Sequence, residues 1–153
     1  MRYLTFALWV LIVGCSLFES NNIDVEIQTD KSAYQIDSTE TIHVDITNHS
    51  DDTIYYICTG QIYLEELSNS QVVNTWLVHG FEECLSPGPI ESDETESFEI
   101  DLFWIWTHGF LGEMTLSEGV KFRLRVDLYE DIEFENMVTG SQVFSNQFTL
   151  EFI

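Results

Sequence analysis

The segment Thr41-Ile-His-Val-Asp-Ile-Thr47 decides the fold class, because apolar and polar residues alternate strictly along it. Its three aliphatic side chains would face one side, and His43 and Asp45 would face the other. This period of two is typical of a β-strand that buries one face. The turn cluster Asn48-His-Ser-Asp-Asp52 follows directly, so the strand is expected to end there.

Seven further stretches alternate in the same way or are rich in β-branched and aromatic residues, and turn residues bound them. They are residues 25–28, 53–58, 61–67, 71–78, 96–102, 121–128 and 147–153. The later strands would turn Phe98, Ile100, Leu102, Phe122, Leu124, Val126, Leu128, Phe148, Leu150 and Phe152 inward. Ser68-Asn-Ser70 would close a hairpin, and Ser86-Pro-Gly-Pro89 would form a tight turn. Without a long helical period, the chain is predicted to be an all-β, antiparallel sandwich of about seven or eight strands over residues 25–153.

Three motifs in this region resemble the start of bacterial immunoglobulin-like domains. They are Thr29-Asp-Lys-Ser-Ala-Tyr34, Glu40-Thr-Ile-His-Val-Asp-Ile-Thr-Asn-His-Ser50 and Thr53-Ile-Tyr-Tyr56. The resemblance covers most of residues 25–153 and implies an immunoglobulin-like sandwich. Members of this family are structural or adhesive modules of surface proteins, and a related sandwich is a proteinase inhibitor. The long aromatic segment Phe103–Gly119 departs from the family pattern.

The first residues have the composition of an export signal. Met1-Arg-Tyr3 supplies one positive charge, and an uncharged, mostly apolar run extends to Val13. As a helix this run would span about 16 Å, roughly half of a bilayer core, so a membrane-spanning helix is not expected. The run ends at Ile12-Val-Gly-Cys15, which resembles the lipobox of bacterial lipoproteins.

By that resemblance, residues 1–14 are a signal peptide and Cys15 becomes a lipidated N-terminus, followed by a tether to residue 24. The lipid would anchor the protein to the extracytoplasmic face of a bacterial membrane. Ordinary signal cleavage with a soluble product is the alternative.

The number of cysteines agrees with lipidation. The chain has three, Cys15, Cys58 and Cys84. A lipid on Cys15 leaves an even pair, and an exported protein meets an oxidising environment, so a Cys58–Cys84 disulfide is expected. On the chain-entropy model its closure contributes roughly 3–4 kcal/mol of stability. Two free thiols are the alternative.

The charge balance excludes two classes of partner. The 153 residues include 27 Asp and Glu against 5 Lys and Arg, a net charge of −22. Binding to nucleic acid needs clustered cations at the phosphates, and electrostatic docking on anionic lipid needs them too. With 14% aromatic and 44% hydrophobic residues, the chain is also not a disordered acidic tail.

No motif for catalysis or for a zinc site occurs around the four histidines, His43, His49, His79 and His108. We therefore expect neither an enzyme nor a cofactor. Three acidic clusters, Asp51-Asp52, Glu91–Glu96 and Glu130–Glu135, lack the spacing of a calcium loop. They are interpreted as a solvated surface rather than metal sites, and Glu130–Glu135 alternates as an exposed strand edge would.

The aromatic stretch from Leu102 to Met114 is the candidate ligand surface. It places Phe103, Trp104, Trp106 and Phe110 close together in the sequence. One interpretation is a plug that covers an open end of the sandwich. The other is a platform on which aromatic rings stack against sugars or fill a partner's pocket.

The sequence thus favours a non-catalytic, lipid-anchored binding or structural module whose partner is an envelope protein or a glycan. Three alternatives stay open. The first is a proteinase inhibitor that acts through Phe103–Gly119 or Asp131–Ser145. The second is an extracytoplasmic hydrolase, which lacks a motif. The third is a subunit of an envelope complex that pairs through an exposed strand edge.

Overall fold

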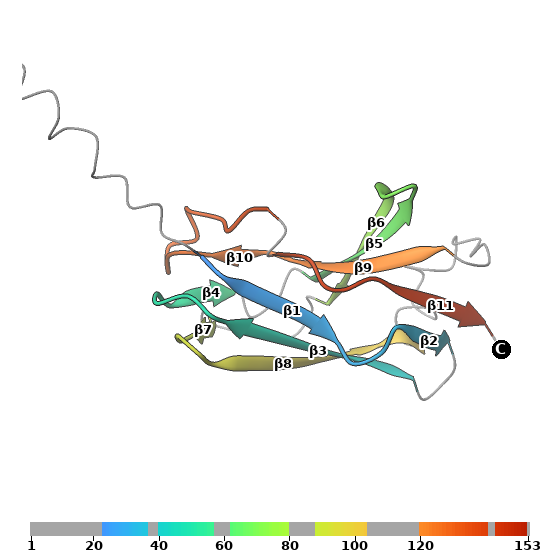
Figure 1. Cartoon of the computed structure of the whole chain (residues 1–153), viewed down its shortest axis with the longest axis horizontal. Helices are drawn as coiled ribbons and strands as arrows, with labels where there is room; N and C mark the ends of the chain where they lie inside the picture. The colour runs from blue at the N-terminus through green and yellow to red at the C-terminus, as the bar shows by residue number, and fades with distance from the viewer. Residues whose placement is uncertain are drawn as a thin grey trace, which may run out of the picture.

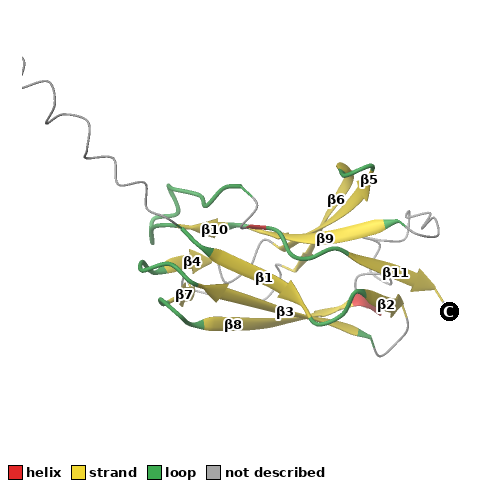
Figure 2. Ribbon diagram, in the orientation of Figure 1, coloured by secondary structure: helices red, strands yellow, loops and turns green. Residues whose placement is uncertain are grey.

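A computed structural model describes residues 23–36, 40–56, 62–79, 88–103, 120–140 and 143–152. In these ranges the chain is an all-β sandwich, as the sequence predicted (Figures 1 and 2). Eleven strands make three sheets, against the seven or eight strands expected. No helix in these ranges is both long enough and apolar enough to cross a membrane.

The first sheet has the order β1-β3-β8 and is antiparallel throughout. Its strands are β1 (Val25–Thr29), β3 (Thr41–Asn48) and β8 (Thr95–Asp101). The five-stranded sheet has the order β2-β11-β9-β5-β6. Its strands are β2 (Ala33–Ile36), β11 (Phe148–Phe152), β9 (Lys121–Val126), β5 (Ile62–Ser68) and β6 (Gln71–His79). A third sheet, of order β10-β4-β7, joins β10 (Leu128–Tyr129), β4 (Ile54–Tyr56) and β7 (Gly88–Ile90).

The core lies between the sheets, and alternation puts the expected side chains into it. Along β3 every second residue is buried, and Val44 and Ile46 are completely so. The inward-facing residues predicted for β9 and β11 are buried as expected, within the described side chains. Phe98 is the exception, because it is only half-buried and its ring meets the edge of Tyr56, with centroids 5.3 Å apart.

The strands β2 and β7 were not expected from the sequence, and the strand predicted over residues 121–128 is divided at Asp127 into β9 and β10. The predicted turn at Ser86–Pro89 is wrong in its second half, because Gly88 and Pro89 pair with β4. Gly88 fits this position because a Cβ there would overlap the ring of Tyr56. Pro89 is tolerated because β7 is an edge strand, where a missing N–H costs no ladder bond.

The chain changes sheets between β1 and β2. The sequence predicted an antiparallel sandwich, and this is wrong for one pair of strands, because β2 pairs with β11 in parallel. Tyr34 Oη donates to Asp30 Oδ1 (2.7 Å), which also accepts the His43 N–H (3.1 Å). Burial works to raise the pKa of Asp30, but these two hydrogen bonds and the charges of His43 and Lys31 together outweigh burial, so the pKa is lowered. Burial, together with the bond to Asp30, raises the pKa of Tyr34 to about 12.

A buried asparagine joins the first sheet to the third. Asn48 ends β3 and is fully buried. Its Nδ2 donates to the carbonyls of Asp52 (2.8 Å) and Ile90 (2.9 Å). Its Oδ1 accepts from the N–H (3.0 Å) and the hydroxyl of Ser50. The turn predicted after β3 is therefore tied to β7 by one side chain.

The hairpin predicted at residues 68–70 is confirmed. It joins β5 to β6, and its turn residues Asn69 and Ser70 have φ of 51° and 63°. Positive φ at both central positions is the type I′ geometry, which matches the twist of the flanking strands. In Figure 1 the tip of the β5–β6 hairpin rises above β9, with which β5 pairs as far as Leu67.

Candidate functional site

The outer face of β9 gathers cations in a strongly acidic protein. Lys121, Arg123 and Arg125 occupy alternate positions, so they share the face opposite the buried residues of β9. They are three of only five Lys and Arg in the chain. Arg123 and Arg125, with Glu65 on β5 and Asp127 after β9, form what we call the Arg–carboxylate cluster.

Glu65 is the centre of this cluster because it lies directly opposite Arg123 in the β5–β9 ladder. Its Oε2 accepts from Nε and Nη2 of Arg123, both at 2.8 Å, and its Oε1 lies 3.3 Å from Nε of Arg125. The carboxylate is buried, at 5% relative exposure, so pairing is what makes its charge tolerable there.

Aromatic rings hold both guanidinium groups in place. Cζ of Arg123 lies 3.6 Å from the ring centroid of Phe144, and Cζ of Arg125 lies 4.2 Å from that of Tyr63. Such cation–π contacts contribute about 0.5–2 kcal/mol each, more when the pair is shielded from water. The two arginines are therefore fixed in orientation by rings as well as by carboxylates.

Asp127 completes the cluster. Its Oδ1 lies 3.4 Å from Nη1 of Arg125. Burial raises the pKa of Asp127, the charge of Arg125 lowers it, and the charge of Glu65 adds to the rise, so that the net shift is upward. The loss of hydration at Asp127 therefore outweighs the attraction of its arginine.

A pocket opens beside this cluster because the segment after β10 leaves the sheet and returns. It pairs with Tyr129 at Met137 and with Arg125 at Phe144, through isolated bridges. Between these two points Gly140 adopts a φ of 95°, a left-handed conformation that glycine enters without strain. The space between segment and sheet is the pocket.

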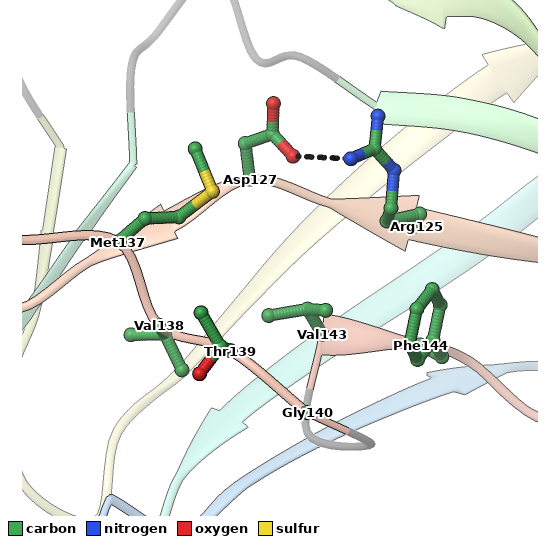
Figure 3. Close-up of a pocket in the computed structure, with 8 residues that line it drawn as sticks. All are labelled: Arg125, Asp127, Met137, Val138, Thr139, Gly140, Val143 and Phe144. Atoms are coloured by element: carbon green, nitrogen blue, oxygen red, sulfur yellow. Dashed lines mark ion pairs between the residues drawn. The ribbon is translucent and has the colours of Figure 1, made fainter.

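The pocket has a volume of about 290 Å³ (Figure 3). It is lined by Arg125, Asp127, Met137, Val138, Thr139, Gly140, Val143 and Phe144. Figure 3 shows Arg125 and Asp127 reaching toward each other on one side, and Val138, Thr139 and Val143 on the returning segment. One wall is thus an ion pair with no net charge, and the remainder is mostly apolar.

This arrangement suits recognition of a group that is neutral and amphipathic. The guanidinium can donate hydrogen bonds and the carboxylate can accept them, while the valines and Phe144 offer an apolar surface. Pockets that bind small groups combine these two features, a few fixed polar atoms in a mostly apolar lining.

Comparison with known proteins gives no close relative. No family model matches the chain, and no curated protein matches it. A beta-glucosidase from Listeria innocua, solved with isofagomine, is similar with a TM-score of 0.37 and 16% identity over 86% of this chain and 17% of that one. Spo0M, a sporulation control protein from Bacillus subtilis, is similar with a TM-score of 0.36 and 13% identity over 84% of this chain and 49% of that one. The chain spans less than half the length of both, and likeness at this level carries no argument about activity.

Most of the residues singled out by sequence for covalent or ligand roles lie outside the described residues. They are Cys15, Cys58, Cys84, Trp104, Trp106 and Phe110. Phe103 is described and is partly exposed, at 42%. The expectations of a lipid, of a disulfide and of an aromatic platform therefore remain predictions.

The histidines do not gather at a common site in the described ranges. His43 lies on the outer face of β3 with Nδ1 3.4 Å from Glu99, and His49 lies in the turn after β3 with Nε2 3.5 Å from Glu26. His79 ends β6, and His108 lies outside the described residues.

One expectation for the acidic clusters is wrong, because Glu130–Glu135 is a loop and not a strand edge. Asp131 accepts backbone N–H groups from Glu135 (3.0 Å) and Asn136 (2.8 Å), and Phe134 has a φ of 60°. Among the described residues, no three of His, Cys, Asp and Glu come together as a metal site would require.

The Arg–carboxylate cluster was missed at the sequence level, although a signal was present. Lys121-Phe-Arg-Leu-Arg125 alternates cations with apolar residues in a chain that has almost no other cations. Such spacing places three positive charges on one face of a strand, and burial of that face requires carboxylates from a neighbouring strand.

Proposed function

We propose that this chain is a non-catalytic binding module of the bacterial immunoglobulin-like type, anchored by a lipid at Cys15 on the extracytoplasmic face of a membrane. The observation that carries binding over catalysis is the pairing in the Arg–carboxylate cluster. Glu65 is engaged by Arg123, and Asp127 lies against Arg125. A general base or nucleophile must be free to meet its substrate, whereas here the charged groups beside the pocket neutralise one another.

The chemistry of the pocket supports a ligand with an apolar face and neutral polar groups. A sugar ring of a glycan and a side chain of an envelope protein both have this character. The acidic surface of the chain disfavours anionic ligands at long range, which leaves neutral groups as the better match.

The proposal is tested with ligand-observed NMR on the full chain, using a panel of neutral saccharides and N-acetylated dipeptides. Thr139 lines the pocket from an exposed position, so Thr139→Trp fills the pocket with little effect on the core. We expect at least one compound to bind, Thr139→Trp to abolish the signal, and the matched variant Thr139→Ser to retain it. Equal binding by Thr139→Trp, or no binding of any compound, contradicts this use of the pocket.

The anchor has its own test, mass spectrometry of the mature N-terminus from bacterial cells. We expect a chain that begins at Cys15 and carries the mass of a diacylglycerol and its acyl groups. A free, unacylated N-terminus downstream of residue 15 would overturn the anchor and leave the binding proposal standing.

Proteinase inhibition through the loop after β10 is the second candidate, because side-chain and backbone hydrogen bonds within the loop order it. The hydrogen bonds from the N–H groups of Glu135 and Asn136 lower the pKa of Asp131, and Ile132 is 53% exposed at the surface of the loop. A loop that is ordered before binding loses little entropy on docking into a protease cleft. We would expect Ile132→Asp to remove any inhibition, and a wild-type chain that inhibits no protease in a broad panel rules this function out.

A further inference from the structure

Among the described strands, each of the three sheets ends in two edge strands, and five of these six edges are protected against pairing with another chain. Unprotected edges invite aggregation, so natural sheets shorten them, charge them or cover them. Two are covered within the described ranges: β1 by a bridge from Ile27 to Ser145, and β10 by the N–H of Val138, which donates to Leu128 at 2.8 Å.

Three other edges are protected by length or by charge. The strand β7 has three residues, one of them Pro89, and β2 has four residues. The edge strand β8 is longer but carries three carboxylates, Glu96, Glu99 and Asp101. Each of these would pair poorly with an incoming strand.

The sixth edge, β6, is different. It is nine residues long, and its sequence, Gln71-Val-Val-Asn-Thr-Trp-Leu-Val-His79, contains no Asp, Glu, Lys, Arg or Pro. In a chain with 27 acidic residues, such a stretch stands out. Among the described residues β6 pairs only with β5, so its other side has no strand partner there.

The outer half of β6 also lacks cover on its faces. Residues 71–75 are all exposed, including Val72 at 43% and Val73 at 50%. On its other side β5 pairs with β9 as far as Leu67, so this half of β6 is the outermost strand of a continuous sheet. A strand added to β6 would give it a second ladder and cross-strand contacts with its exposed side chains.

Two irregularities in the β5–β6 register limit where a new strand can pair. They lie opposite the Glu66–Leu67 and Ile62–Tyr63 steps, and they leave Val73 and Val78 without partners in the ladder. Between them, the run from Asn74 to Leu77 pairs in continuous register. The acceptor segment of the edge is therefore Asn74–Leu77.

Charge decides which occupant fits. A second copy of this chain would bring another net charge of −22 against the first, for a ladder only four residues long. A partner with cations beside its strand gains attraction from the acidic surface instead.

We propose that Asn74–Leu77 of β6 accepts an extended segment of a basic partner protein, which adds a strand to the five-stranded sheet. The segment has uncharged, β-branched residues at its centre and Lys or Arg at its ends. Main-chain hydrogen bonds to β6 supply affinity, and contacts with Val72 and Val73 supply selectivity. This surface is separate from the pocket beside β9, so variants at Thr139 leave it unaffected.

The test uses the full chain in detergent and a fluorescent peptide of alternating Thr and Val with Lys at both ends. Fluorescence anisotropy measures its affinity, and hydrogen exchange followed by NMR locates it. Controls are the same peptide with N-methylated alternate amides, and one with Glu in place of Lys. Thr75→Lys places a charge on the edge, and Gln35→Lys on β2 makes the same change in net charge elsewhere.

We expect the Lys-flanked peptide to bind, with at least about tenfold loss of affinity on N-methylation and on Thr75→Lys, and no loss on Gln35→Lys. Amide protection should increase at residues 74–77. Absence of binding, equal binding of the N-methylated peptide, or protection elsewhere would overturn the proposal. Dimerisation of the chain in analytical ultracentrifugation, lost in Thr75→Lys, would overturn it by assigning the edge to a second copy.

Discussion

Removal of the amide at Asn48 is predicted to cause a large loss of stability. Asn48→Ala deletes four hydrogen bonds and leaves the buried carbonyl of Ile90 and the buried N–H of Ser50 without that partner. Each bond contributes about 1 kcal/mol net, and the carbonyl of Asp52, which belongs to an exposed residue, can bond to water instead, so the expected loss is about 3 kcal/mol. For a domain of this size, that corresponds to a Tm lower by roughly 10 °C.

Urea denaturation followed by circular dichroism measures this loss, with the slope of the transition as a check on two-state behaviour. The matched control is Asn74→Ala, since this exposed amide bonds only to Glu66, at 2.6 Å, in the described contacts. It should cost about 0.5 kcal/mol or less. If Asn48→Ala costs no more than Asn74→Ala, then Asn48 does not tie β3 to β7 and the reasoning is refuted.

Three further substitutions have defined outcomes in the same denaturation assay. Tyr34→Phe should lower the free energy of unfolding by about 1 kcal/mol at neutral pH. The difference from the wild type should narrow below pH 3.8, because protonation of Asp30 removes the stability that its lowered pKa gives the wild type. A difference that widens in acid would contradict this. Gly88→Ala should lower the free energy of unfolding by about 1–3 kcal/mol, because the added Cβ overlaps the ring of Tyr56. In a Tyr56→Ala background the same substitution should cost nothing. Equal costs in the wild-type and Tyr56→Ala backgrounds would exclude the overlap. Asp127→Asn should be at least as stable as the wild type at pH 7, because the raised pKa of Asp127 means that its charged form costs stability as pH rises. The gain in stability should vanish at a pH low enough to protonate Asp127 in the wild type. A clear loss of stability at pH 7 would refute the prediction.

The alternation in the sequence was sufficient to predict the long strands, because the pattern that marks a long strand is contained in its own residues. The period of two along β3 and β9 follows directly from one buried face, and Val44 and Leu124 are buried as predicted. Strands of two to four residues, such as β10, are too short for any period to appear. They form because neighbouring strands offer them hydrogen-bond partners, and a local sequence pattern carries no information about those partners.

The crossing from β1 to β2 shows the same limit at longer range. The parallel pair β2–β11 joins segments near opposite ends of the chain, so no local pattern encodes it. The pocket depends on such contacts too, since it exists only because Met137 and Phe144 return to pair with β10 and β9. What sequence does contain is the spacing of Arg123 and Arg125, whose partner Glu65 becomes evident once β5 is known to lie beside β9.

The parallel pairing of β2 with β11 has a mechanical consequence. The chain enters the sandwich at Ile23 and leaves it at Phe152, and Figure 1 places β1 and the end of β11 toward opposite ends of the body. A pull between these two points slides β2 along β11 instead of peeling them apart. Under such shear the hydrogen bonds of the ladder share the load and must break together, so the domain resists extension between these two points far better than its thermodynamic stability alone would suggest.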